Sequence, residues 1–131
     1  MIMAMFAMVT VAKADVYITV DKSSQTMYVQ SPQGEFVWDV STARSGYKTP
    51  VGNFKPYRLE KMHYSKKYDN APMPHSIFFV GGYAIHATYA IGRLGTPASH
   101  GCVRLAPQNA RWLYSIVREN GMENTHIRII Q

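Results

Sequence analysis

Apolar and polar residues alternate with a period of two through the first part of the chain, a pattern typical of half-buried β-strands. Residues 16–20 and 26–30 follow it on either side of a turn-rich segment, and residues 35–41 repeat it after a Pro-Gln-Gly turn. We therefore expect two successive hairpins at the start of the domain. Residues 53–59 predict a further strand.

The middle of the chain changes from polar to apolar. Residues 60–74 are polar and too numerous for a tight hairpin loop, so we expect an excursion over the surface that acts as a flap. The apolar run 77–80 predicts a short central strand. Gly81-Gly82 suits a tight turn into a following strand over residues 83–87.

The last third of the chain predicts one convincing helix, over residues 107–120. Pro107 suits its first position, and Gly121 suits its end. Residues 125–130 then predict a closing strand. The expected fold class is mostly β with one principal α-helix. The apolar residues that repeat at helical spacing are Trp112, Leu113, Ile116 and Val117.

Length and composition indicate one globular domain behind a targeting segment. The chain has 131 residues, 47% hydrophobic and 17% charged, with no apolar run long enough for a membrane helix. Residues 1–12 are nearly all apolar, and Ala12-Lys13-Ala14 fits a small-x-small cleavage pattern. We expect a signal peptide over residues 1–14 and a mature domain over 15–131. A buried N-terminal strand or helix is the alternative.

The chain is basic. Its net charge is +6, or +5 once Lys13 is removed with the signal peptide. The positive residues are scattered, which argues against a nucleic-acid partner, while an anionic wall polymer fits an exported protein. Plain solubility explains the charge equally well, and we expect a monomer.

Cys102 is the one cysteine, so an internal disulfide is impossible and the thiol is either inert or kept for chemistry. His100 stands two positions before it, with Gly101 between them, and a loop after His86 allows that second imidazole to fold back toward the thiol. A nucleophilic thiol needs a base within hydrogen-bond reach and N–H donors for the oxyanion. These residues offer candidates for each part.

Other interpretations of the same residues stay open. A lone cysteine is usually a small buried hydrophobe, and a lone histidine is usually a satisfied polar residue. A zinc site from Cys102, His100 and His86 with His63 or His75 is conceivable, but the paired ligand spacing of common zinc sites is missing. We expect no metal and no cofactor.

Two motifs carry a resemblance to a known family. Ile85-His86 is followed, after about a dozen residues, by Ser99-His100-Gly101-Cys102-Val103-Arg104-Leu105. Upstream, residues 41–54 contain Ser-Thr, Gly, Thr-Pro and Gly-x-Phe at fixed spacing, with Ala43 where a Gly is usual. Both stretches resemble the L,D-transpeptidase catalytic domain (YkuD-like), whose signature is His, a gap, then Ser/Thr-His-Gly-Cys.

The resemblance implies a mostly-β, sandwich-like fold with a nucleophile in a cleft under a flap. It implies that Cys102 attacks the carbonyl between the third and fourth residues of a peptidoglycan stem tetrapeptide and expels D-alanine. His86 is then the base, oriented by the carbonyl of Ala87, and His100 helps to position the thiol and the acyl group. The N–H groups of Gly101 and Cys102 form the oxyanion hole.

The remaining expected contacts concern substrate binding. Arg104 suits a substrate carboxylate, with a structural ion pair as the alternative. Ser99, Ala87 and Tyr83 are further pocket residues, and Tyr83 is expected to pack more than to contact substrate. Thiol chemistry also implies acylation by carbapenems.

The acceptor is left open by the sequence. A second stem peptide gives a 3-3 cross-link in peptidoglycan biosynthesis, with consequences for cell shape. An outer-membrane protein amine gives a tether to the wall, and water gives an L,D-carboxypeptidase. A non-catalytic wall-binding module is the alternative from another class. All of these imply a periplasmic or secreted, wall-associated location.

Overall fold

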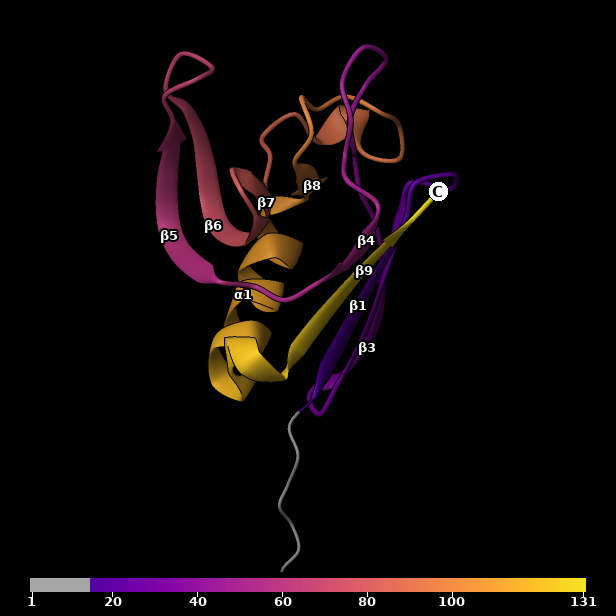
Figure 1. Cartoon of the computed structure of the whole chain (residues 1–131), viewed down its shortest axis with the longest axis vertical. Helices are drawn as coiled ribbons and strands as arrows, with labels where there is room; N and C mark the ends of the chain where they lie inside the picture. The colour runs from indigo at the N-terminus through magenta and orange to yellow at the C-terminus, as the bar shows by residue number, and fades with distance from the viewer. Residues whose placement is uncertain (1–14) are drawn as a thin grey trace, which may run out of the picture.

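The computed structural model describes residues 15–131 as two β-sheets and one long helix (Figure 1). The predicted signal peptide lies outside the described residues. No helix within 15–131 combines the length and apolar character needed to span a bilayer. The prediction of a mostly-β fold with one principal helix is confirmed.

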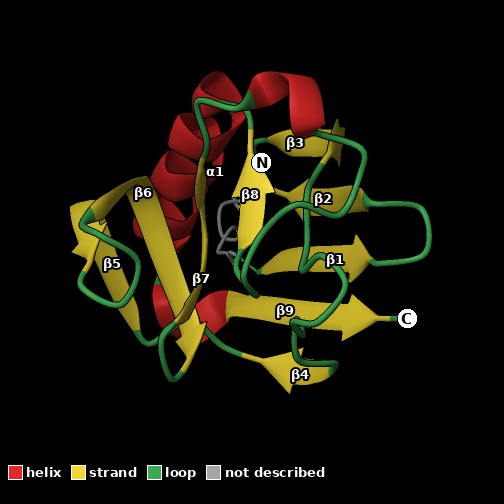
Figure 2. Cartoon of the chain, turned by 90° about the horizontal axis from the view of Figure 1, so that it is seen from above, coloured by secondary structure: helices red, strands yellow, loops and turns green. Residues whose placement is uncertain are grey.

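The larger sheet has the strand order β3-β2-β1-β9-β4 (Figure 2). Both predicted hairpins are present, since β1 pairs antiparallel with β2 and β2 with β3. The predicted closing strand is β9, which runs parallel to β1 and antiparallel to β4. The strand bounds are β1 (Val16–Asp21), β2 (Thr26–Ser31), β3 (Gly34–Asp39), β4 (Gly52–Phe54) and β9 (Thr125–Ile130).

The smaller sheet has the order β5-β6-β7-β8 and carries the candidate site. Gly81 and Gly82 make the expected tight turn, because Val80 pairs with Tyr83 and Gly81 adopts a φ of 52°. β7 and β8 run parallel, joined by a crossover that includes η2 (Ile91–Arg93). The bounds are β5 (Arg58–Ser65), β6 (Ala71–Val80), β7 (Tyr83–Ala87) and β8 (Val103–Leu105).

The prediction of one strand over residues 53–59 was wrong. β4 ends at Phe54 and β5 begins at Arg58, and the two belong to different sheets. Pro56 lies in the connection, where its missing N–H would interrupt a ladder. The segment therefore passes the chain from one sheet to the other.

Residues 60–74 form most of a long β5–β6 hairpin, so the expected irregular excursion was also wrong. Pro72 and Pro74 had argued against a strand. They fit because this half of β6 pairs only with β5, which leaves its other edge free. At the tip, Asp69 and Asn70 adopt left-handed φ angles of 56° and 55°, which short polar residues tolerate.

The helix α1 (Pro107–Asn120) begins and ends as predicted. Pro107 lies in the first turn, and Gly121, with a φ of 99°, donates its N–H to the Val117 carbonyl. Trp112 was expected on the buried face, but it is 45% exposed and meets the ring of Phe36 edge-on. The apolar residues that α1 does bury are Ala110, Leu113, Tyr114, Ile116 and Val117.

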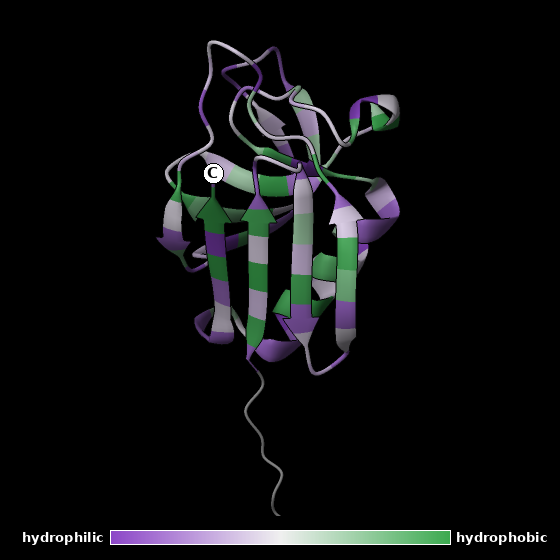
Figure 3. Cartoon of the chain, turned by 90° about the vertical axis from the view of Figure 1, so that its right-hand side faces the viewer, coloured by the Kyte–Doolittle hydropathy of each residue, from purple (hydrophilic) through white to green (hydrophobic). Residues whose placement is uncertain are grey.

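One apolar core joins both sheets to α1. The inward residues of β1, Val16, Ile18 and Val20, pack in the same cluster as Ile127 and Ile129 of β9 and the buried face of α1. Figure 3 shows the matching alternation of apolar and polar bands along the strands of the larger sheet. A short η3 helix (Met122–Asn124) connects α1 to β9. The core thus fixes the smaller sheet relative to the larger one.

Replacing Leu113, which is fully buried, by Ala should lower the free energy of unfolding by ~2–5 kcal/mol, because the cavity is only partly refilled. Trp112→Ala, one position away, should cost about 1 kcal/mol, mainly the aromatic contact with Phe36. Urea denaturation followed by circular dichroism measures both. Equal losses for the two variants would contradict the assignment of the buried face.

Candidate active site

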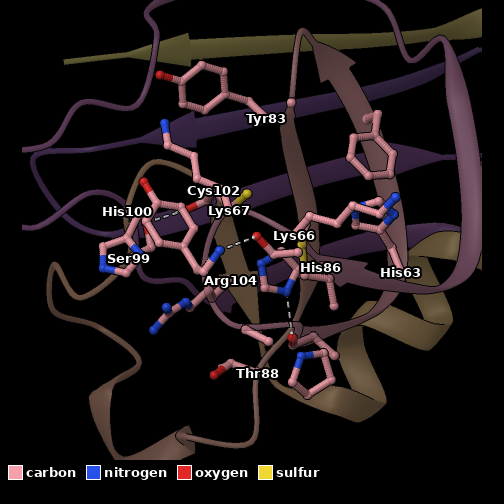
Figure 4. A pocket seen from close by; sticks show the side chains of 18 of the residues that line it. His63, Lys66, Lys67, Tyr83, His86, Thr88, Ser99, His100, Cys102 and Arg104 are labelled. Carbon is pink, nitrogen blue, oxygen red and sulfur yellow. Dashed lines mark hydrogen bonds between the residues drawn. The ribbon is translucent and has the colours of Figure 1, made fainter.

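The parallel pairing of β7 with β8 brings together the segment of His86 and the Ser99-His100-Gly101-Cys102 segment. His86 lies in register with Arg104, and Cys102 immediately precedes β8. The three side chains border one cavity of about 700 Å³ (Figure 4). The crossover after β7 therefore folds back as the sequence predicted, and it places an imidazole and the thiol on the same cavity.

His86 is 7% exposed, and its Nδ1 lies 2.7 Å from the carbonyl oxygen of Ala87. A carbonyl can only accept, so Nδ1 must carry the proton. The unprotonated nitrogen is then Nε2, which forms no hydrogen bond within residues 15–131. The expected contact with Ala87 is present, and it leaves the imidazole in the tautomer that can act as a base.

Burial keeps both members of this pair neutral. It lowers the pKa of His86 to about 4, with the charges of Arg104 and His63 acting in the same direction and the Ala87 carbonyl opposing. Burial also raises the pKa of the half-buried Cys102 thiol, against the smaller opposing effects of the Ala84 N–H and Arg104. The resting pair is a thiol beside a neutral imidazole.

Hydrogen bonds within the turn before Cys102 fix the position of the thiol. Ser99 is fully buried, and its hydroxyl donates to the Cys102 carbonyl at 2.6 Å and accepts from the Gly101 N–H at 3.0 Å. The Gly101 N–H was expected to serve the oxyanion hole, but it is already engaged by Ser99. The Ser99 hydroxyl therefore stabilises this turn through two hydrogen bonds within the protein.

Both the backbone conformation and the lack of space for a Cβ atom require glycine at position 101. Its φ is 142°, and an added Cβ would lie 2.4 Å from Cε1 of Tyr83 and 2.9 Å from the Lys48 carbonyl oxygen. Tyr83 thus packs over the turn, as the sequence analysis favoured.

The upstream motif supports the same turn from the other side. Thr49 donates its hydroxyl to the Gly101 carbonyl at 2.8 Å and accepts from the Ala43 N–H. The Thr42 carbonyl accepts from the N–H groups of Ala98 and Ser99. The buried amide of Gln25 in turn accepts from the Thr42 N–H and donates to the Thr42 hydroxyl. The motif was visible in the sequence, but the sequence did not show that these residues hydrogen-bond to the turn before Cys102.

His100 borders the cavity, but its ring is held by other partners. Arg44 donates to His100 Nε2 at 2.8 Å, and Tyr68 from the tip of the β5–β6 hairpin stacks on the ring at 4.0 Å. Partial burial, followed by the charges of Arg44, Arg104 and Lys67, lowers the pKa of His100. His100 therefore connects the hairpin tip to the loop that holds Arg44.

Arg104 forms no ion pair with any residue in 15–131, so the structural ion pair considered from the sequence is absent from the described chain. Three further cationic side chains border the cavity and no Asp or Glu does. They are Arg58, Lys66 and Lys67; the sequence indicated no site role for them, because Lys66 and Lys67 lie in the segment predicted as a flap and Arg58 lies in a predicted strand. His63 and Tyr68 border the same cavity.

Within the described chain, no three His, Cys, Asp or Glu side chains gather closely enough to hold a metal ion. The five residues considered for zinc do not form such a group, since His75 packs edge-on against Tyr114 of α1 and His63 bonds to Glu60. What the site offers chemically is a thiol, the imidazoles of His63, His86 and His100, and a cationic lining.

Residues 15–128 match the L,D-transpeptidase catalytic domain family. The chain belongs to this family. A search of curated proteins finds no significant match. The family match spans almost all of the described residues, including both L,D-transpeptidase motifs.

Solved L,D-transpeptidases share the fold. The enzyme from Mycobacterium smegmatis has a TM-score of 0.79 at 22% identity, covering 90% of this chain and 59% of that one. The one from Stackebrandtia nassauensis has a TM-score of 0.74 at 28% identity, covering 98% and 61%. L,D-transpeptidase 3 from Mycobacterium tuberculosis, solved with a faropenem-derived adduct, gives 0.76 at 20%, covering 90% and 61%. The chain spans about three fifths of the length of these structures.

Gly101→Ala should destabilise the protein by ~1–3 kcal/mol, because the new Cβ meets the Tyr83 ring and the backbone conformation is strained. Gly82→Ala is a matched control, since nothing lies within 4 Å of its Cβ position and its φ is not in the left-handed range. Thermal unfolding compares the two. A Gly101→Ala protein as stable as the Gly82→Ala protein would argue against a tightly packed turn.

The free energy of unfolding should fall as the pH drops from about 6.5 to about 4. In this range His86 takes up a proton in the unfolded chain but stays neutral in the folded one, so acid favours unfolding. The contribution of His86 is up to about 3 kcal/mol, since each pH unit between the two pKa values adds ~1.4 kcal/mol.

Urea denaturation of wild type and His86→Gln across this pH range isolates that contribution. The difference between the two proteins should change with pH in this window and level off above it. A pH-independent difference would mean that His86 titrates normally in the folded protein.

Proposed function

We propose that this chain is a peptidoglycan L,D-transpeptidase whose Cys102 thiol forms an acyl-enzyme with a stem tetrapeptide and releases D-alanine. Family membership supports the reaction class. The assignment of residues rests on one observation. His86 Nδ1 is hydrogen-bonded to the Ala87 carbonyl, and His86 borders the same cavity as Cys102.

His86 Nε2 accepts the thiol proton as the sulfur attacks the carbonyl carbon between the third and fourth residues. The same proton then passes to the nitrogen of the departing D-alanine. A neutral starting pair suits this role, because the proton moves only when the bond forms. We propose the Cys102 N–H as the oxyanion donor, because the Gly101 N–H is already bonded to the Ser99 hydroxyl.

The cationic lining suits a donor that carries carboxylates. Arg104 stands next to the pair without an acidic partner in the described chain, and a guanidinium binds a carboxylate through two parallel hydrogen bonds. Lys66 and Lys67 add charge at the hairpin tip. Arg104 is therefore our candidate for anchoring a free carboxylate of the stem peptide.

An export route and β-lactam sensitivity belong to the same proposal. The apolar segment over residues 1–12, ahead of Ala12-Lys13-Ala14, supports export to the periplasm or the wall. The thiol is proposed to be acylated by carbapenems, in line with the faropenem-derived adduct of the Mycobacterium tuberculosis enzyme.

Incubating the protein with disaccharide-tetrapeptide should give a Cys102-linked acyl-enzyme, free D-alanine and a cross-linked dimer. Mass spectrometry of the protein and of the products detects all three. Cys102→Ala should abolish them because it removes the attacking sulfur. His86→Gln should slow D-alanine release by ~10²-fold or more, the usual contribution of a general base.

The products also separate the alternatives. Tripeptide without dimer favours the L,D-carboxypeptidase or a protein acceptor that is absent from the tube. Binding of peptidoglycan by Cys102→Ala and wild type alike, with no turnover by either, would support a non-catalytic wall-binding module. A folded protein with a titratable thiol that forms no acyl-enzyme would falsify the proposal.

A further inference from the structure

The cavity beside Cys102 continues along the β5–β6 hairpin to a second histidine. Phe78 of β6 belongs to the small apolar cluster against which Cys102 packs. The ring of His63 meets Phe78 edge-on at 5.0 Å, and the Arg58 guanidinium lies 4.2 Å from the centre of that ring. Both side chains border the cavity, and Figure 4 shows His63 there. The thiol and this imidazole thus pack against the same small apolar cluster, and the mechanism above does not use the imidazole.

Glu60 holds this imidazole in a defined state. Its carboxylate lies 2.9 Å from His63 Nδ1 and 3.0 Å from Arg58 Nε. A carboxylate accepts hydrogen bonds, so Nδ1 carries the proton and Nε2 is left to accept one. Within residues 15–131, His63 Nε2 has no hydrogen-bond partner. Like His86, His63 therefore borders the cavity with its Nδ1 bonded to an oxygen acceptor and its Nε2 without a partner in the described chain.

The second half of a transpeptidation has one more proton to move than His86 can carry. An acceptor amine reaches the site at neutral pH as an ammonium ion. When its nitrogen bonds to the acyl carbon and the thioester C–S bond breaks, one proton replaces the acyl group on sulfur. His86 can carry that proton from nitrogen to sulfur. A second proton must leave the ammonium first, so that a lone pair is free to attack.

We propose that His63, oriented by Glu60, is the group that takes this proton from the acceptor ammonium. The inference rests on the proposed function and extends it to the acceptor side. The charges around the cavity favour the transfer, because Lys66, Lys67 and Arg104 border it, while Glu60, which is bonded to Arg58 and His63, does not border it itself. Such surroundings disfavour a bound ammonium and favour the neutral amine. The acceptor class is then a primary amine delivered along the hairpin.

The test measures the fate of the acyl-enzyme with disaccharide-tetrapeptide as both donor and acceptor. D-alanine release in the first turnover reports acylation, dimer reports transfer to the amine, and tripeptide reports hydrolysis. For His63→Gln at pH 7, first-turnover D-alanine release should stay within about twofold of wild type, while the dimer-to-tripeptide ratio should fall at least about tenfold. Near pH 10 the amine loses its proton without help, so the ratio should recover.

Two further variants sharpen the result. Glu60→Gln should lower the ratio in the same direction, because a neutral amide no longer fixes the tautomer of His63. His126→Gln is the matched control: His126 is also paired with a carboxylate, that of Asp15, but lies on the larger sheet away from the cavity. It should leave the ratio unchanged at both pH values.

Failure of the inference is distinct from failure of the proposed function. A wild-type ratio for His63→Gln at pH 7, or a loss that persists at pH 10, overturns the role of His63 while leaving Cys102 chemistry in place. An equal fall in first-turnover D-alanine release points to a structural role and also overturns it, as does a wild-type acyl-enzyme that reacts with water alone. Absence of any acyl-enzyme in wild type instead refutes the proposed function.

Discussion

The position of the Cys102 thiol depends on the paired hydrogen bonds of one buried hydroxyl. Ser99 accepts from the Gly101 N–H and donates to the Cys102 carbonyl, which leaves the turn before β8 little freedom to change conformation. Breaking one of these bonds would leave a buried polar group unpaired, at a cost of ~1–3 kcal/mol. Thr49 and Thr42 continue the network into the upstream loop, and Gln25 carries it to the first hairpin. Both sheets therefore contribute to holding one sulfur atom.

Much of the fold could be predicted because its strands and helix are encoded locally. The alternation in β1 and β2 and the Pro107 and Gly121 signals of α1 depend on nearby residues alone. The β5–β6 hairpin could not be predicted in the same way. Its prolines are unfavourable in most strands and are tolerated only because that half of β6 has a free edge, which is a property of the assembled sheet.

In the candidate site, too, the features encoded by local sequence could be predicted, and those that depend on the folded chain could not. The sequence motif identified Cys102 and His86, and the structure brings both to one cavity. The motif did not show that the Gly101 N–H donates to the Ser99 hydroxyl, because the folded turn determines the hydrogen-bond partners. The motif also did not predict that His63 borders the cavity, because this depends on where the β5–β6 hairpin lies in the folded chain. Side chains from a segment with no recognisable pattern are the ones that single-sequence reasoning misses.

The neutral resting state of the thiol has a consequence for the survival of the enzyme. Disulfides and peroxides react with the thiolate, and Cys102, the one cysteine in the sequence, has no partner with which to form a protective internal bridge. Burial, which raises the pKa of Cys102, keeps the reactive form scarce between turnovers. In the proposed reaction, the sulfur becomes nucleophilic only when an electrophile binds close enough for His86 to remove its proton. Under that proposal, the same burial that keeps the thiol protonated also protects it from oxidants between turnovers, without a disulfide.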